Sequence, residues 1–117
     1  VDQVVLGVDP ITMLTGPLPA TAKILARNGM TMGDVDVTEI NEAFAVVVAA
    51  WLREHGPDLD RVNPRGGAIA LGHPLGSSGA RLITTLLHEL EDRDEEVGLV
   101  TMCCGGGLGI ATLVQRV

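Results

Sequence analysis

Short runs rich in Val, Ile and Leu alternate along this chain with longer segments of helical character, and this alternation constrains the fold more than any other feature. Pro10 stops the first run, and Pro19 is expected in the first turn of a helix, because its ring presets the dihedral angle φ. A later helix is indicated by aliphatic side chains at helical spacing, namely Leu82, Ile83, Leu86, Leu87 and Leu90. Strands are predicted over 1–9, 35–40, 61–63, 97–103 and 109–117. The resulting order, β-α-β-α-β-α-β-β, predicts an α/β fold with a mixed five-stranded sheet that is mostly parallel and ends in a hairpin.

The helix expected over about 41–54 contains the run AFAVVVAAWL (43–52), which is apolar on every face. Asn41 and Glu42 are interpreted as its cap and as an acid that complements the helix dipole. A helix that is apolar all round is buried on all sides, whereas one sheet covers only one side. We therefore expect a further layer to cover it, so that this domain is part of something larger. The run is far shorter than the roughly 20 apolar residues of a membrane span, and none is expected.

Size and charge narrow the class of protein. The 117 residues are 46% hydrophobic and form one domain, 1–117, whose core must be aliphatic because Phe44 and Trp51 are the only aromatic side chains. A net charge of −7 argues against a nucleic-acid partner, which needs a basic surface. The first residues have neither the basic nor the long apolar region of a signal peptide, so a cytoplasmic location is expected.

Two adjacent cysteines, Cys103 and Cys104, run directly into three glycines. Neighbouring Cα atoms lie about 3.8 Å apart, closer than the roughly 4.4–6.8 Å of an ordinary disulfide, so two free thiols in a reducing compartment are expected. One interpretation makes them small buried apolar side chains. Another makes one of them a reactive thiol beside glycine N–H groups that also suit an oxyanion. Because consecutive strand residues point to opposite sides, only one cysteine is expected to face a given site, and the local sequence does not say which.

Neither a phosphate-binding loop nor a metal site is indicated. The glycines at 105–109 miss the pattern G-x-G-x-x-G/A and precede a strand rather than a helix, and 66–79 lacks the G-K-[ST] of a P-loop. The His and Cys residues do not have the spacing of zinc ligands. We expect no metal and no resident cofactor.

The three histidines differ in their contexts. His55 ends a helix before Gly-Pro, where an interaction with the helix dipole accounts for it, and His88 lies on the outer part of a helix. His73 stands in LGHPLGSSG, where Pro74 keeps it out of helical geometry and glycines allow close approach. For His73 the local context favours a functional role and a hydrogen-bonded loop histidine about equally.

Three segments together resemble the thiolase family in order and spacing: NEAFA (41–45), NPRGGAIALGHPLGSSGAR (63–81) and CCGGGLGIA (103–111). Thiolases are acyl-CoA:acyl-CoA acyltransferases that cleave or form 3-ketoacyl-CoA. The resemblance covers essentially the whole chain and only the C-terminal half of such an enzyme. It implies two similarly folded halves packed as a five-layer αβαβα sandwich, in which the second half covers the apolar helix.

The resemblance also implies residue roles. His73 matches the family's histidine that takes the proton from a nucleophilic cysteine, and Cys103 matches the second acid/base, which serves the carbanion of acetyl-CoA. Gly105 matches a backbone N–H donor to an oxyanion, and Asn41 matches the residue holding a water that forms a second oxyanion hole with His73. These are sensible roles, because Claisen exchange needs one group to hold the acyl thioester and another to deprotonate the attacking carbon.

Substrate contacts follow in the same way. Ala43 and Phe44 match the lining of the pantetheine channel, so coenzyme A and its acyl thioesters are the expected substrates. The family's acyl-carrying cysteine belongs to the N-terminal half, which this chain does not contain, and Cys104 is expected to point away from the site. The chain by itself is therefore expected to have no thiolase turnover.

Alternatives to a catalytic thiolase half remain open on sequence grounds. One is a non-catalytic thiolase-like module, either a binding or assembly partner or a truncated remnant, and another is half of a β-ketoacyl synthase. The retention of Asn41, His73 and Cys103 favours the catalytic half, and a cysteine before the glycines disfavours the synthase. The expected protein partner is the N-terminal half, from the same gene or a second chain. The apolar surface that it leaves uncovered predicts a homo-oligomer.

Overall fold

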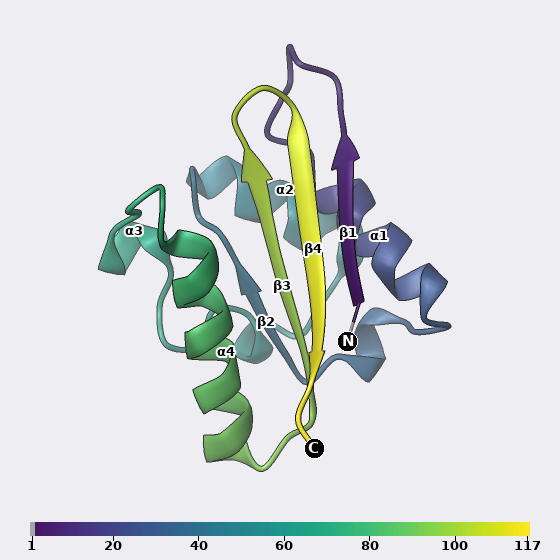
Figure 1. Ribbon diagram of the computed structural model, residues 1–117, viewed down its shortest axis with the longest axis vertical. Helices are drawn as coiled ribbons and strands as arrows, with labels where there is room; N and C mark the ends of the chain where they lie inside the picture. Colours follow the sequence, from purple (N-terminus) through teal and green to yellow (C-terminus); the bar gives the residue numbers. More distant parts are fainter. Residues whose placement is uncertain (1) are drawn as a thin grey trace.

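Strands form where Val, Leu and Ile run in short stretches, and helices form in the longer segments between them. The computed structural model describes residues 2–117. Its elements in chain order are β1 (Asp2–Gly7), α1 (Pro17–Arg27), β2 (Val37–Ile40), α2 (Ala45–His55), α3 (Ala68–Leu71), α4 (Ser78–Arg93), β3 (Val97–Cys104) and β4 (Leu108–Gln115) (Figure 1). Short 3-10 turns lie at Met32–Asp34 and Leu59–Arg61. The succession of strands and helices confirms the predicted α/β class.

The strands form one mixed sheet in the order β1-β4-β3-β2. β2 and β3 are parallel, while β4 is antiparallel to both β3 and β1, so the expectation of a mostly parallel sheet is wrong: β4 returns from the hairpin and separates β3 from β1. The hairpin of β3 and β4 places Cys103 opposite Gly109. Because parallel strands end at the same edge of a sheet, the segments that follow β2 and β3 leave the sheet side by side.

The expected fifth strand at 61–63 is wrong: the sheet formed by residues 2–117 has four strands, and only Val62 makes a single bridge, to Thr38. The chain departs at Asn63, whose φ of 46° lies in the left-handed region. Its side-chain amide makes the hydrogen bonds that a neighbouring strand would have made to Ile40. Oδ1 accepts one from the Ile40 N–H (2.8 Å), and Nδ2 donates one to the Ile40 carbonyl (3.0 Å). A side chain thus satisfies the edge of β2 that a strand was expected to cover.

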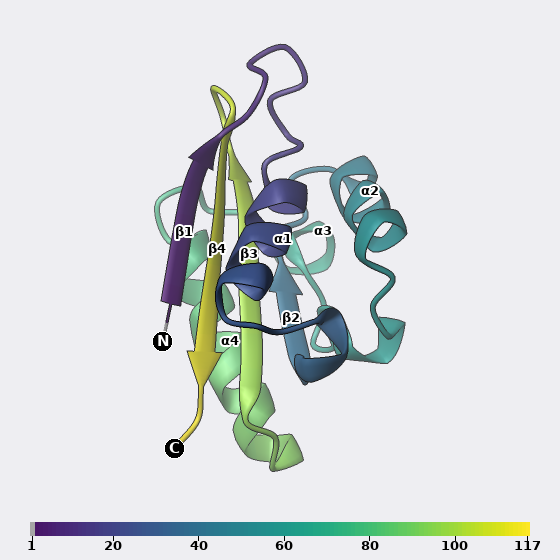
Figure 2. The ribbon, with the colours of Figure 1, turned by 90° about the vertical axis from the view of Figure 1, so that its right-hand side faces the viewer.

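Helices cover both faces of the sheet, which is why two apolar cores form. Figure 2 shows α1 and α2 together on one side of the sheet. Their core includes Ile24, Trp51 and Leu99, and the core beneath α4 consists of Val37, Leu82, Leu86, Leu90 and Val100. The neighbours Leu99 and Val100 enter opposite cores, as the alternation of side chains along a strand requires.

The α2 helix differs from its prediction in where it begins. It begins at Ala45 rather than Asn41, because the chain is still extended at Phe44, with φ −150° and ψ 148°. It also buries only one face, through Val47 and Trp51, whose Nε1 donates to Thr21 Oγ1 (2.9 Å). The opposite face is open, and Val46 is 69% exposed. One side is what this chain alone was expected to cover, and the further layer over the open face stays a prediction.

Candidate active site

A cavity of about 400 Å³ lies where β2 and β3 end, the edge at which ligands commonly bind in α/β sheets. Figure 1 shows that the turn between β3 and β4 lies at this end of the sheet, the end toward which both β2 and β3 run. The residues that line the cavity are Leu14, Ala43, Phe44, His73, Leu75, Met102, Cys103, Cys104 and Gly105. Segments far apart in the sequence therefore converge on one space.

Five of the residues singled out from the sequence share this cavity, namely Ala43, Phe44, His73, Cys103 and Gly105. Asn41 is fully buried and does not line the cavity, although it lies two residues before Ala43. Cys104 also lines it, contrary to the expectation that it points away. Cys104 is the last residue of β3 and precedes a glycine turn. The alternation of side chains between the two faces of the sheet ends there, so it no longer directs Cys104 away from the cavity.

His73 is held by the first turn of α4. Its Nδ1 lies 2.6 Å from Ser78 Oγ, and the Ser78 hydroxyl donates to the Pro74 carbonyl (2.8 Å). A serine hydroxyl has one hydrogen, so Oγ accepts its bond from the Nδ1–H of His73. A neutral imidazole that donates from Nδ1 carries its lone pair on Nε2, which is the tautomer that a general base at Nε2 needs.

Cys103 is a buried thiol beside open glycine backbone. Burial raises the pKa of Cys103, and the neighbouring Cys104 raises it further, while a backbone hydrogen bond at Cys103 lowers it. Such a thiol is protonated at neutral pH, which suits a group that exchanges a proton rather than a standing thiolate. Gly105 is exposed, and no other part of the chain lies within 4 Å of where its Cβ would stand, so its backbone is accessible to a ligand.

Glu42 and Asn63 hold the segments around the cavity together, and neither was recognised from the sequence. Asn63 Nδ2 donates to Glu42 Oε1 (3.0 Å), and the Ile69 N–H donates to Glu42 Oε2 (2.9 Å). Glu42 is therefore not an acid at the start of α2; it fastens the end of β2 to the segment leading to His73. A signal for this was present in the stretch NPRGG, where an Asn before Pro and a glycine pair indicate a specific turn.

Replacing Gly67 by Ala is expected to loosen this connection, because the new methyl group would overlap the Glu42 carboxylate. The side chain of Glu42 must then move and lose its hydrogen bonds, each worth about 1.5–3 kcal/mol for a charged partner. We expect a loss of about 2 kcal/mol in the free energy of unfolding, measured by urea denaturation. Gly76→Ala is the matched control, since no atom lies within 4 Å of its added Cβ. Equal effects of the two substitutions would contradict this account.

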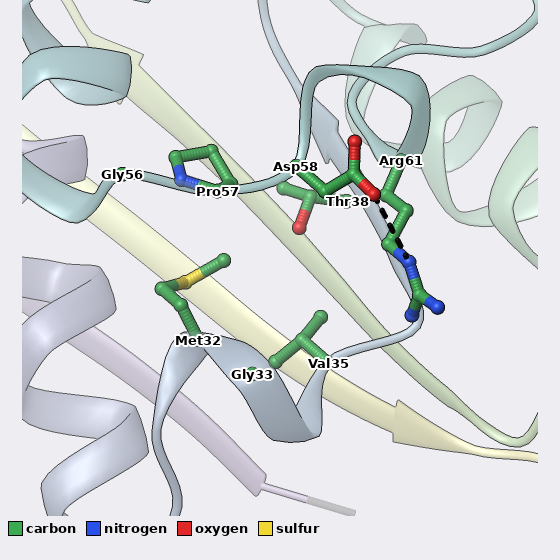
Figure 3. Close-up of a pocket in the computed structure, with 8 residues that line it drawn as sticks. All are labelled: Met32, Gly33, Val35, Thr38, Gly56, Pro57, Asp58 and Arg61. Atoms are coloured by element: carbon green, nitrogen blue, oxygen red, sulfur yellow. Dashed lines mark ion pairs between the residues drawn. The ribbon is translucent and has the colours of Figure 1, made fainter.

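A second hollow lies near the start of β2 and contains none of the predicted residues. Its volume is about 160 Å³, and Figure 3 shows its lining: Met32, Gly33, Val35, Thr38, Gly56, Pro57, Asp58 and Arg61. The ion pair between Asp58 and Arg61 (3.8 Å) crosses one side of it. This volume is below the roughly 300–1,000 Å³ of typical ligand pockets, so the larger cavity is the better candidate.

Residues 2–117 lack two further features. No helix in this part of the chain is long and apolar enough to cross a membrane. Within the same residues, no group of three or more His, Cys, Asp or Glu side chains is arranged to hold a metal ion.

The fold and this cavity define a class of protein, an α/β domain with a histidine and a thiol at the carboxyl edge of its sheet, and the comparison with known families identifies it further. The family model described as "Thiolase, C-terminal domain" matches residues 1–116. This chain belongs to the thiolase family.

Similar proteins and a solved structure agree with this assignment. The steroid 3-ketoacyl-CoA thiolase FadA6 of Mycobacterium tuberculosis is 56% identical over 92% of this chain and 26% of its own length. The acetyl-CoA acetyltransferase of Escherichia coli is 51% identical over 94% of this chain and 28% of its own. The crystal structure of the Bacillus anthracis acetyl-CoA acetyltransferase superposes with a TM-score of 0.95 and 42% identity, over 98% of this chain and 29% of that one. The chain thus spans less than a third of the length of these relatives.

Proposed function

We propose that this chain is the C-terminal catalytic half of a thiolase and takes part in acyl transfer between coenzyme A thioesters, by cleaving 3-ketoacyl-CoA or forming acetoacetyl-CoA. The observation that carries the proposal is the shared cavity: His73, Cys103 and Gly105 come from two distant segments and line one space at the end of β3. Membership of the thiolase family and the activities for which the similar proteins are named support the same reaction class.

In the first half-reaction, His73 removes the proton from a nucleophilic cysteine contributed by the other half of the enzyme. Its Nδ1–H is occupied by Ser78, which leaves Nε2 to accept that proton. The thiolate attacks the keto carbon of 3-ketoacyl-CoA, the bond to the α carbon breaks, and the acyl group stays on sulfur as a thioester. Because the hydrogen bond to Ser78 fixes the orientation of the imidazole, the base is already placed for proton transfer.

Cys103 completes the cleavage by protonating the departing carbon, so that the electron pair of the broken bond ends in a C–H bond of acetyl-CoA. A buried thiol with a raised pKa holds this proton at neutral pH and gives it up to a much more basic carbanion. Formation of acetoacetyl-CoA runs the same steps backwards, with the thiolate of Cys103 removing the α proton. The backbone N–H of Gly105 stabilises the oxyanion next to that carbon, and Asn41 with His73 holds the water of the second oxyanion hole.

The remaining walls of the cavity suit the substrate rather than the chemistry. Phe44, Leu14, Leu75 and Met102 give it an apolar lining, and Ala43 leaves space beside Phe44 for the pantetheine arm. No resident cofactor takes part in this scheme, since coenzyme A enters as a substrate. We assign the selection of acyl chain length to residues outside this chain, and a role in lipid metabolism in the cytoplasm stays a prediction.

A second half is also proposed as the structural partner. The exposed side of α2, which presents Val46 and the neighbouring Phe44 at 69% and 61% exposure, is the face that this half covers. Left uncovered, an apolar face of this kind drives self-association. We expect the isolated chain to run as a homo-oligomer in size-exclusion chromatography, and a monodisperse monomer would contradict this expectation.

The test is a fusion in which this chain replaces the matching segment of the Escherichia coli acetyl-CoA acetyltransferase. We expect the fusion to cleave acetoacetyl-CoA with free coenzyme A and the isolated chain to show no turnover. Normal turnover by the isolated chain would contradict the need for a second half. A folded fusion that binds coenzyme A without cleaving the substrate would favour a non-catalytic binding module instead.

A further inference from the structure

Unpartnered polar atoms are concentrated in the layer between β2 and the first turn of α4. Both carboxylate oxygens of Glu39, both amide atoms of Asn41 and all three guanidinium nitrogens of Arg81 are buried without a hydrogen-bond partner. Within residues 2–117, the only other buried side-chain nitrogen or oxygen in this condition is Oε2 of Glu95. Buried polar groups in folded proteins are nearly always hydrogen-bonded, so this concentration needs an explanation.

The alternation of β2 places these side chains on one face. Val37 packs into the core beneath α4, whereas Ile40 packs into the opposite core, so Glu39 and Asn41 share the α4 face with Val37. Both are fully buried, and the hydrogen bond from the Asn41 N–H to the Thr101 carbonyl (2.9 Å) continues the strand ladder to this point.

Arg81 approaches from α4. It lies in the first turn of this helix, and long helical side chains lean toward the helix N-terminus. The same turn carries Ser78, which binds His73. The guanidinium nitrogens of Arg81 are buried, and their charge acts on Glu39 across the layer between α4 and β2.

A direct ion pair does not fill this layer. No pair between Glu39 and Arg81 is found at 4.0 Å or less among the ion pairs of residues 2–117, although both groups are buried. An isolated buried charge is very costly, so both groups need polar partners. Water fits, because a buried water makes two to four hydrogen bonds and the three side chains offer both donors and acceptors.

We propose that ordered water bridges Glu39 and Arg81 and orients the amide of Asn41, which makes Glu39 a positioning residue of the thiolase site. The inference rests on the proposed function, because it assigns Asn41 its part in holding the catalytic water. An amide has a donor end and an acceptor end, and only its hydrogen-bond partners decide which end faces the site. Glu39 and Arg81 are the buried groups that make this decision.

The protonation of Glu39 gives this arrangement a measurable signature. Burial raises the pKa of Glu39 to about 7, the charge of Arg81 opposes this shift, and the charges of Glu89 and Glu42 add to it. These are the charged groups that act on Glu39 from α4 and from the segment after β2. Near pH 7 the carboxyl changes from a hydrogen-bond donor to a pure acceptor, and the bridging water must reorient with it.

The first arm of the test is structural and independent of activity. Crystal structures of the fused enzyme at pH 6 and pH 8 are expected to show water within hydrogen-bond distance of Glu39, Arg81 and Asn41. A carboxylate in direct contact with the guanidinium, with no water between them, would overturn the proposal even if the enzyme is active. This arm also decides the proposal if the fused enzyme turns out to lack thiolase activity.

The second arm uses E39Q, which keeps the shape of the side chain and removes its titration. We expect kcat to fall roughly tenfold to 100-fold, the cost of a misplacement near 1 Å, with KM for coenzyme A unchanged. In the unsubstituted fused enzyme, the titration of Glu39 should give kcat a step near pH 7. This step should vanish in E39Q. The control is E89Q, because Glu89 is equally buried but is paired with Arg65 and Arg93; it should keep the step, with its midpoint lowered. An unchanged step in E39Q overturns the proposal.

Discussion

Replacing Cys103 by Ala is expected to lower ketothiolysis by the fused enzyme roughly 10²- to 10⁴-fold, the usual contribution of a positioned general acid/base. Without this thiol, the departing carbon loses the group that is proposed to supply its proton. His73→Ala should cause a loss of the same order, because Nε2 no longer accepts the proton of the nucleophile. Steady-state cleavage of acetoacetyl-CoA measures both, with circular dichroism to verify that each variant is folded.

Cys104→Ala is the matched control for this prediction. Cys104 is a second thiol, adjacent in sequence and lining the same cavity, so its removal changes the cavity by a similar volume. We expect this variant to retain most of the activity, because the proposed chemistry uses only Cys103. If Cys104→Ala loses as much activity as Cys103→Ala, the assignment of the acid/base to Cys103 is wrong.

Gly16→Ala is expected to cause the largest loss of stability. Gly16 precedes α1 and lies against β4, so that an added Cβ would stand 2.5 Å from the Cα of Gly109 and 2.6 Å from the carbonyl oxygen of Leu108. Both atoms belong to backbone held in the sheet, which cannot move aside as a flexible side chain does. Overpacking of this kind costs about 3 kcal/mol or more, a large share of the roughly 5–15 kcal/mol that stabilises a domain.

Urea denaturation of Gly16→Ala beside Gly33→Ala tests this expectation. The nearest atom to a Cβ added at Gly33 is Thr31 Oγ1 at 3.5 Å, an ordinary contact, so this control should change the unfolding midpoint little. A stable Gly16→Ala protein would mean that α1 does not depend on its close approach to β4. Because Leu108 follows the glycine turn beside the cavity, the unstable variant is also expected to lose substrate binding.

Much of the fold follows from local chemistry. Val97–Cys104 forms the strand expected over 97–103, and α4 contains all five aliphatic residues whose spacing indicated a helix. These elements are long and strongly periodic, and their own side chains specify them. The expected strand at 61–63 and the expected start of α2 at Asn41 were wrong, because Asn63 and Glu42 act through contacts with segments far along the chain.

In the candidate site, too, some features follow from the local sequence and others depend on how distant segments pack. His73, Cys103 and Gly105 stand out in the sequence because proline and glycines surround them, and their family motif implies their roles. The position of Cys104 on the same cavity and the burial of Asn41 beneath it were not expected, since both depend on how β3 ends and how α4 packs on β2.

The sequence by itself determined the α/β class, the order of its main elements and the residue types that carry the proposed chemistry. Periodicity, proline and glycine act over a few residues and can be recognised in one chain. Only the tertiary structure decided that Asn63 replaces a strand, that Glu42 fastens two segments, and that Glu39, Asn41 and Arg81 share one buried layer. The physical reason is that a hydrogen bond depends on distance and direction in space, and residues 20 to 40 positions apart acquire these only when the sheet and its helices pack.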